Sequence, residues 1–145
     1  MRFADLADGG RRLAELLTDD VVGDALVVCI GEGGQVTGRA VAAALGIEVV
    51  PVATARTDDG VTVDLSSVAV AGRSVVVVDD GVETGTAAIA AGAAIRSAGA
   101  TRVVLAVPVC PRDAEAHLRT GYDDVIAVTK PVVRRSLRWH YETFA

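Results

Sequence analysis

Five short runs of this sequence are mainly apolar, and Ala-rich stretches with helical spacing lie between them. The runs cover residues 25–30, 47–53, 74–78, 102–107 and 125–128. The intervening helical patterns cover residues 36–45, 86–98 and 112–119. Strands that are apolar on both faces are typical of a parallel sheet covered by helices on each side. The sequence therefore predicts an α/β fold, a single doubly wound domain over residues 1–145 with a mainly parallel sheet of about five strands.

The two ends and one internal segment depart from this alternation. Residues 1–20 predict an N-terminal amphipathic helix, interrupted by the flexible pair Gly9 and Gly10. Residues 57–60 predict a turn that opens a hairpin with residues 61–65. Residues 129–145 form a tail that holds three of the chain's five aromatic residues. This tail could stack on a ligand, pack at a subunit contact or, as we expect, dock onto the first helix through Phe3.

Composition excludes several classes of partner. The formal net charge is −5, whereas binding to duplex nucleic acid needs a basic face. No apolar run approaches the ~18 residues that a membrane span needs. Cys29 and Cys110 each lie in an apolar run, which favours buried thiols in a reducing compartment. We therefore expect a cytoplasmic protein that binds neither duplex nucleic acid nor a membrane.

The most informative stretch follows the third apolar run. Four valines at 75–78 predict a central strand, and Asp79 and Asp80 stand at its carboxyl end, where open α/β sheets bind ligands. The turn at 83–87 then opens a helix whose first amides and dipole favour a phosphate. Two carboxylates beside a phosphate site suit the vicinal hydroxyls of a sugar phosphate. The alternative is an acidic turn that only caps the helix, for which one acid would suffice.

This strand, acid pair and turn resemble the type I phosphoribosyltransferases, which bind phosphoribosyl pyrophosphate (PRPP). The resemblance extends along nearly the whole chain, through the opening helix, the glycine loop at 31–34, the strand end at 106–111 and the aromatic tail. It implies that Asp79 and Asp80 bind the ribose hydroxyls and, through the bound ribose, a Mg²⁺ cofactor. We also expect a homodimer. The resemblance further implies a pyrophosphate loop at Gly33 and Gly34. It also implies a turn that binds the 5-phosphate, formed by Glu83, Thr84, Gly85, Thr86 and Ala87.

The sequence departs from the family pattern at three places. Ala87 stands where the family usually has Thr or Ser, so Thr86 supplies the hydroxyl or one phosphate contact is lost. Glu32 replaces an Arg of the pyrophosphate loop, and it either points away or holds Mg²⁺ with the pyrophosphate. The segment that corresponds to the family's mobile lid is short. Arg56 either replaces the basic residue of that lid as a catalytic residue or is an exposed surface charge.

These observations predict a phosphoribosyltransferase that binds PRPP and Mg²⁺ and transfers ribose 5-phosphate to a nitrogenous base or related acceptor. The alternative is a protein of the same fold that binds PRPP or a nucleoside monophosphate without catalysis, as a sensor or as a partner of another chain. Both readings place the ligand at Asp79 and Asp80.

Overall fold

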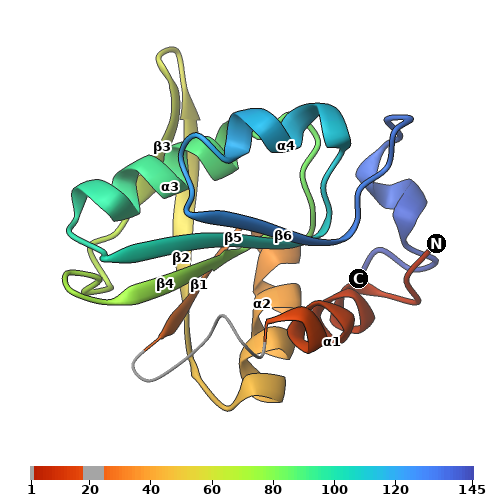
Figure 1. The fold of residues 1–145 in the computed structure, drawn as a ribbon, viewed down its shortest axis with the longest axis horizontal. Coiled ribbons are helices and arrows are strands. Elements are labelled where there is room, and N and C mark those ends of the chain that lie inside the picture. Colours follow the sequence, from red (N-terminus) through yellow and green to blue (C-terminus); the bar gives the residue numbers. More distant parts are fainter. Residues whose placement is uncertain (1, 18–24) are drawn as a thin grey trace.

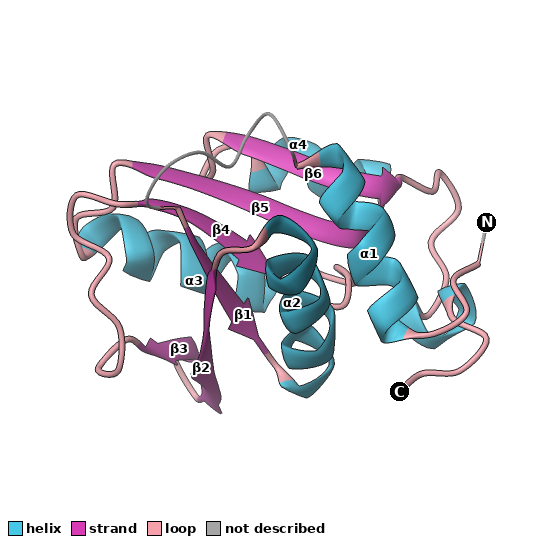
Figure 2. Cartoon of the chain, turned by 90° about the horizontal axis from the view of Figure 1, so that it is seen from below, coloured by secondary structure: helices cyan, strands magenta, loops and turns pink. Residues whose placement is uncertain are grey.

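The computed structural model describes residues 2–17 and 25–145, and it shows one six-stranded sheet with helices on both faces (Figures 1 and 2). The strand order is β3-β2-β1-β4-β5-β6. The strands are β1 (Leu26–Ile30), β2 (Glu48–Thr57), β3 (Gly60–Asp64), β4 (Ser74–Val78), β5 (Arg102–Val109) and β6 (Asp124–Thr129). The helices are α1 (Leu6–Leu16), α2 (Glu32–Leu45), α3 (Thr86–Ser97), α4 (Arg112–Leu118) and the 3₁₀ helix η1 (Leu137–His140).

The predicted doubly wound architecture is confirmed, with one more strand than the five apolar runs indicated. All neighbouring strands pair in parallel except β3, which pairs antiparallel with β2. β3 is the second arm of the hairpin expected at residues 57–65, and Figure 1 shows the hairpin projecting from one edge of the sheet. The residues of β3 are half-buried or exposed, so this strand lacks the apolar pattern from which the five strands were predicted.

Valines on alternate faces of the central strands divide the core into two layers. Val28, Val75 and Val77 pack toward α3 and α4 on one face. Val27 and Val76 pack toward α1 and α2 on the other. Figure 2 shows these two helix layers on opposite sides of the sheet. Because the chain turns to opposite faces after β1 and after β4, the carboxyl ends of these two adjacent strands form the topological switch point of the sheet.

The N-terminal helix is continuous where the sequence predicted a break. α1 runs through Gly9 and Gly10, and it ends at Leu16; residues 18–20 of the predicted helix lie outside the described residues. A Cβ at Gly10 would lie 2.5 Å from the backbone oxygen of Thr37 on α2. Gly10 therefore serves the close approach of α1 to α2, whereas Gly9 makes room for Pro108 and Tyr141, and this packing offsets the weak helix propensity of both glycines.

α2 begins four residues earlier than predicted. Gly31, at φ +75°, is its N-cap, so Glu32, Gly33 and Gly34 form the first helical turn and not a free loop. The helix ends before Gly46, which adopts a left-handed conformation as expected for a C-cap. None of the helices in the described ranges is long and apolar enough to cross a bilayer.

Candidate functional site

The acid pair lies at the switch point, directly after β4. The backbone N–H of Asp80 donates to Asp79 Oδ1 over 2.7 Å, which anchors the Asp79 carboxylate to the backbone of its neighbour. Over residues 2–17 and 25–145, neither carboxylate takes part in an ion pair with Arg or Lys. The pair is therefore not neutralised by the protein itself.

Burial and mutual repulsion change the protonation of the pair. Desolvation, followed by the charge of Asp80, raises the pKa of Asp79 well above its ordinary value. Desolvation is also the largest cause that raises the pKa of Asp80, and the charge of Glu83 adds to it. Two acids that resist ionisation in the free protein are suited to a ligand that brings hydroxyl donors or a cation.

The glycines of α2 make room for the two carboxylates. A Cβ at Gly33 would lie 2.8 Å from Asp80 Cγ, and a Cβ at Gly34 would lie 3.1 Å from Asp79 Oδ1. Gly31 stands nearby, with its added Cβ 3.6 Å from the same Asp79 oxygen. The structure thus brings Gly33 and Gly34 against the acid pair, as a shared site requires, and gives the two glycines a steric role that the sequence did not reveal.

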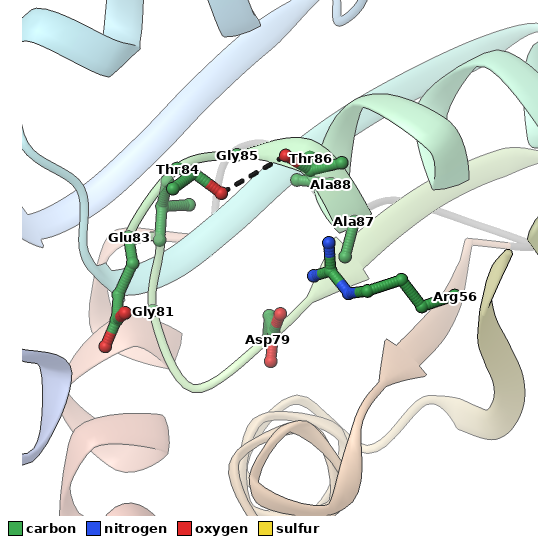
Figure 3. A pocket seen from close by; sticks show the side chains of 10 residues that line it. Arg56, Asp79, Gly81, Glu83, Thr84, Gly85, Thr86, Ala87 and Ala88 are labelled. Carbon is green, nitrogen blue, oxygen red and sulfur yellow. Dashed lines mark hydrogen bonds between the residues drawn. The ribbon is translucent and has the colours of Figure 1, made fainter. Parts of the chain in front are cut away.

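A cavity of about 440 Å³ opens beside Asp79. Figure 3 shows its lining: Asp79, the turn that follows, the first turn of α3, and Arg56 reaching in from β2. The full lining is Arg56, Asp79, Gly81, Val82, Glu83, Thr84, Gly85, Thr86, Ala87 and Ala88. Nine of these ten residues come from the segment 79–88, so one strand–turn–helix unit builds most of the site.

The turn has the geometry of an anion site. Gly85 adopts φ +86° and caps α3, and the first helical hydrogen bond runs from the Ile89 N–H to the Gly85 oxygen over 2.8 Å. The amides of Thr86, Ala87 and Ala88 precede that bond and have no carbonyl partner within the helix. The hydroxyl oxygens of Thr84 and Thr86 lie 3.2 Å apart on the rim, so a hydroxyl is available although Ala87 has none.

The remaining predicted site residues divide between this cavity and its surroundings. Arg56 is an exposed residue of β2, yet its guanidinium points over the cavity. Glu32 is exposed and lines a second cavity of about 240 Å³ with residues of β2, not the cavity that holds Asp79. Glu83 lines the larger cavity, but its Oε1 accepts a hydrogen bond from the Leu137 N–H of the tail over 3.0 Å. Its carboxylate is therefore engaged away from the phosphate turn.

Sequence reasoning missed the contribution of the tail to this region. The Tyr141 hydroxyl donates to the backbone oxygen of Asp80 over 2.5 Å, and Leu137 packs against Gly81. The concentration of aromatic residues near the C-terminus was the available signal, and it predicted docking onto Phe3. That docking is present, with the ring centroids of Phe3 and Tyr141 5.3 Å apart.

Comparison with known proteins identifies the family of this strand–turn–helix unit. The model of the phosphoribosyl transferase domain matches residues 4–136. The chain belongs to the phosphoribosyl transferase domain family. This match confirms the resemblance drawn from the sequence, and it extends from the N-terminal helix into the tail.

Individual relatives agree with the family and with the fold. A Thermus thermophilus protein, TT1426, has a solved structure similar to this chain, with a TM-score of 0.89 and 26% identity over all of this chain and 92% of that one. The adenine phosphoribosyltransferase of Rhodothermus marinus shares the fold, with a TM-score of 0.67 and 20% identity over 85% of this chain and 77% of that one. A Mycobacterium tuberculosis protein named "Putative phosphoribosyl transferase" is 40% identical over 73 residues, which are 50% of this chain but 16% of that protein. The chain thus spans a small part of the curated relative's length.

Proposed function

We propose that this phosphoribosyl transferase domain binds the ribose 5-phosphate part of PRPP and transfers it to a nitrogenous acceptor. The observation that carries the proposal is one cavity that joins the Asp79 carboxylate to the free amides at the start of α3. The carboxylates of Asp79 and Asp80 accept hydrogen bonds from the two ribose hydroxyls. The free amides of Thr86, Ala87 and Ala88 and the Thr86 hydroxyl hold the 5-phosphate.

Mg²⁺ fits this donor set. Asp79 and Asp80 offer the hard carboxylate oxygens that Mg²⁺ prefers, and among the described residues neither acid is taken up by an ion pair. Within the described ranges no group of three His, Cys, Asp or Glu side chains could hold a metal alone. The ion would thus share its coordination with substrate oxygens, and when bound it would neutralise charge on the pyrophosphate.

The protein's own residues would act by orientation and electrostatics. In the transfer, the bond from ribose C1 to the pyrophosphate breaks and a bond from C1 to the acceptor nitrogen forms, with no covalent enzyme intermediate. Arg56 would place a positive charge over the cavity while the leaving group departs. The first-turn amides of Gly33 and Gly34 would hold the pyrophosphate beside the acid pair.

A non-catalytic PRPP- or nucleotide-binding role is the second candidate, and particular residues favour it. Glu32 stands exposed at the start of α2, where it would repel a pyrophosphate bound at the first turn. The segment in the place of the lid is the β2–β3 hairpin, and among the described residues it contributes only Arg56 to the cavity that Asp79 lines. The homodimer expected from the sequence is likewise a proposal, and sedimentation equilibrium tests it.

Calorimetric titration with PRPP and Mg²⁺, followed by a pyrophosphate-release assay over a panel of bases, tests both candidates. Binding with release supports the transferase, and binding without release supports the sensor. The double substitution Asp79→Asn with Asp80→Asn should weaken PRPP binding at least tenfold, since hydrogen bonds to charged groups contribute about 1.5–3 kcal/mol each. The matched control changes another adjacent acid pair, Asp58→Asn with Asp59→Asn, which is exposed at the hairpin turn. Equal affinity in both double variants would refute the site.

A further inference from the structure

The C-terminal segment lies across the loop that joins the acid pair to the phosphate turn. Two tail residues contact this loop, and we call them the tail clamp: Leu137 at the start of η1, and Tyr141 directly after it. Leu137 contacts Glu83 and Gly81, and Tyr141 contacts Asp80. The tail therefore contacts both the acid pair, which would bind the ribose hydroxyls, and the start of the turn that would bind the phosphate.

Tyr141 is held rigidly, so its hydroxyl can fix the group that it contacts. Its side chain is 2% exposed, and its ring packs on Phe3 and, with centroids 5.4 Å apart, on Phe144. Two backbone hydrogen bonds of 2.7 Å join Phe3 to the residues that flank Tyr141. The Phe3 N–H donates to the His140 oxygen, and the Glu142 N–H donates to the Phe3 oxygen. Burial raises the pKa of the Tyr141 hydroxyl, so this group remains a donor. Both ends of the chain thus anchor one O–H against the Asp80 carbonyl.

Leu137 restrains the next part of the same loop. Its backbone N–H donates to Glu83 Oε1, and its side chain fills the space beside Gly81, where an added Cβ would overlap Leu137 Cδ1. Gly81 adopts φ +153°, and the Val82 N–H after it donates to the Val109 oxygen over 2.8 Å. The path from Asp80 to Glu83 is therefore fixed by the tail and by β5 together.

We infer that Tyr141 is a positioning residue that holds Asp80 in the orientation required to bind a ribose hydroxyl. This inference rests on the proposed sugar-phosphate function. Asp80 is confined on two sides: Gly33 of α2 lies against its carboxylate, and the Tyr141 hydroxyl binds its carbonyl. Without the hydroxyl, the Asp80 backbone gains freedom to rotate, and small displacements of a binding group cost affinity steeply.

The inference predicts an effect on one half of the ligand. Ribose 5-phosphate uses both the acid pair and the turn, whereas inorganic phosphate uses only the turn. Loss of the Tyr141 hydroxyl should therefore weaken the sugar phosphate selectively. A general loosening of the fold would weaken both ligands.

The same coupling predicts a signal from the tail. Trp139, the one tryptophan in the sequence, lies in η1 between the two residues of the clamp, with the Arg135 guanidinium 4.3 Å from its ring centroid. If the clamp orders Asp80 for the sugar, the bound sugar must in turn stabilise the clamp, because coupling between two sites is reciprocal. Ribose 5-phosphate should change Trp139 fluorescence in the wild type, and inorganic phosphate should change it less.

The test compares Tyr141→Phe with Tyr122→Phe. Tyr122 is equally suited to lose a hydroxyl, since it is buried and donates to the Ala88 oxygen over the same 2.5 Å, but it does not contact Asp80. Affinities for ribose 5-phosphate and for inorganic phosphate are measured in the presence of Mg²⁺, with the thermal midpoint of each variant. We expect Tyr141→Phe to weaken ribose 5-phosphate about fivefold, and inorganic phosphate less than about twofold. In Tyr122→Phe the ratio of the two affinities should equal that of the wild type.

Each other outcome overturns a defined statement. If the wild type binds no ribose 5-phosphate, the proposed function fails and the role of Tyr141 fails with it. If the wild type binds and Tyr141→Phe keeps the wild-type ratio of affinities, the function stands and the positioning role is refuted. If both tyrosine variants shift the ratio equally, Tyr141 has only a structural role.

Discussion

Substitution of Gly33 by Ala is the sharpest steric probe of the site. The added methyl group would lie 2.8 Å from Asp80 Cγ and closer still to Oδ2, so the carboxylate must turn away. The three atoms nearest to this added methyl group all belong to Asp80, so the clash falls on that residue. The substitution therefore removes one carboxylate from the site without touching its charge.

The cost to folding should be small and the cost to binding large. Ala is favoured over Gly in a helix by about 1 kcal/mol, and a displaced side-chain rotamer costs about 0.5–1.5 kcal/mol. These two effects nearly cancel, so the free energy of unfolding should stay within about 1 kcal/mol of the wild type. A hydrogen bond to a charged group contributes about 1.5–3 kcal/mol, which predicts a loss of about 10- to 100-fold in affinity for ribose 5-phosphate.

Calorimetric titration with ribose 5-phosphate and chemical denaturation measure the two quantities. Gly121→Ala is the control, because an added Cβ there lies 3.9 Å from its nearest neighbour, the Leu118 oxygen, far from the acid pair. Wild-type affinity in Gly33→Ala would refute the assignment of Asp80 to the sugar. A large loss of stability would instead show that Asp80 cannot turn aside.

Two further predictions concern the charges of the site. Because the pKa of Asp79 is raised in the folded protein, its contribution to stability is present at low pH and is lost as pH rises from the ordinary carboxyl value of about 4 through the raised value. Asp79→Asn removes this buried charge, so the variant should be more stable than the wild type at neutral pH; a thermal midpoint that is lower in the variant at neutral pH would contradict this. Glu83→Gln keeps an oxygen that can accept the Leu137 N–H, whereas Glu83→Ala does not, so PRPP affinity should fall about fivefold further in the alanine variant. Equal PRPP affinities in the two Glu83 variants would show that the hydrogen bond from the Leu137 N–H is not needed for ligand binding.

The fold was predictable because its main signal is local. Strands β1 and β4 are buried at every central position, and apolar runs of this kind are typical of a parallel sheet covered on both sides. The start of α2 was less predictable, since Gly33 and Gly34 are poor helix formers by propensity. Their place in the helix depends on Asp79 and Asp80, which are distant in sequence and meet them only across the β1–β4 pairing.

The site was predictable to the extent that it lies in one segment. Residues 79–88 supply nine of the ten lining residues, and the order of acids, glycine and threonine in that segment carries its own chemistry. Arg56 could not be assigned in this way, because an exposed strand residue and a cavity residue have the same sequence pattern. Only the register of β2 beside β1 brings its guanidinium over the cavity.

Glu83 illustrates why the role of a single residue within a correct motif can still be misjudged. By position it belongs to the phosphate turn, yet a carboxylate facing a phosphate would be repelled. The structure resolves this conflict through Leu137, which lies 54 positions further along the chain and whose N–H binds the carboxylate on the side away from the turn. Since the same tail also reaches the Asp80 carbonyl through Tyr141, the acid that looked unfavourable for phosphate binding becomes one of the two points where the tail holds the ligand loop.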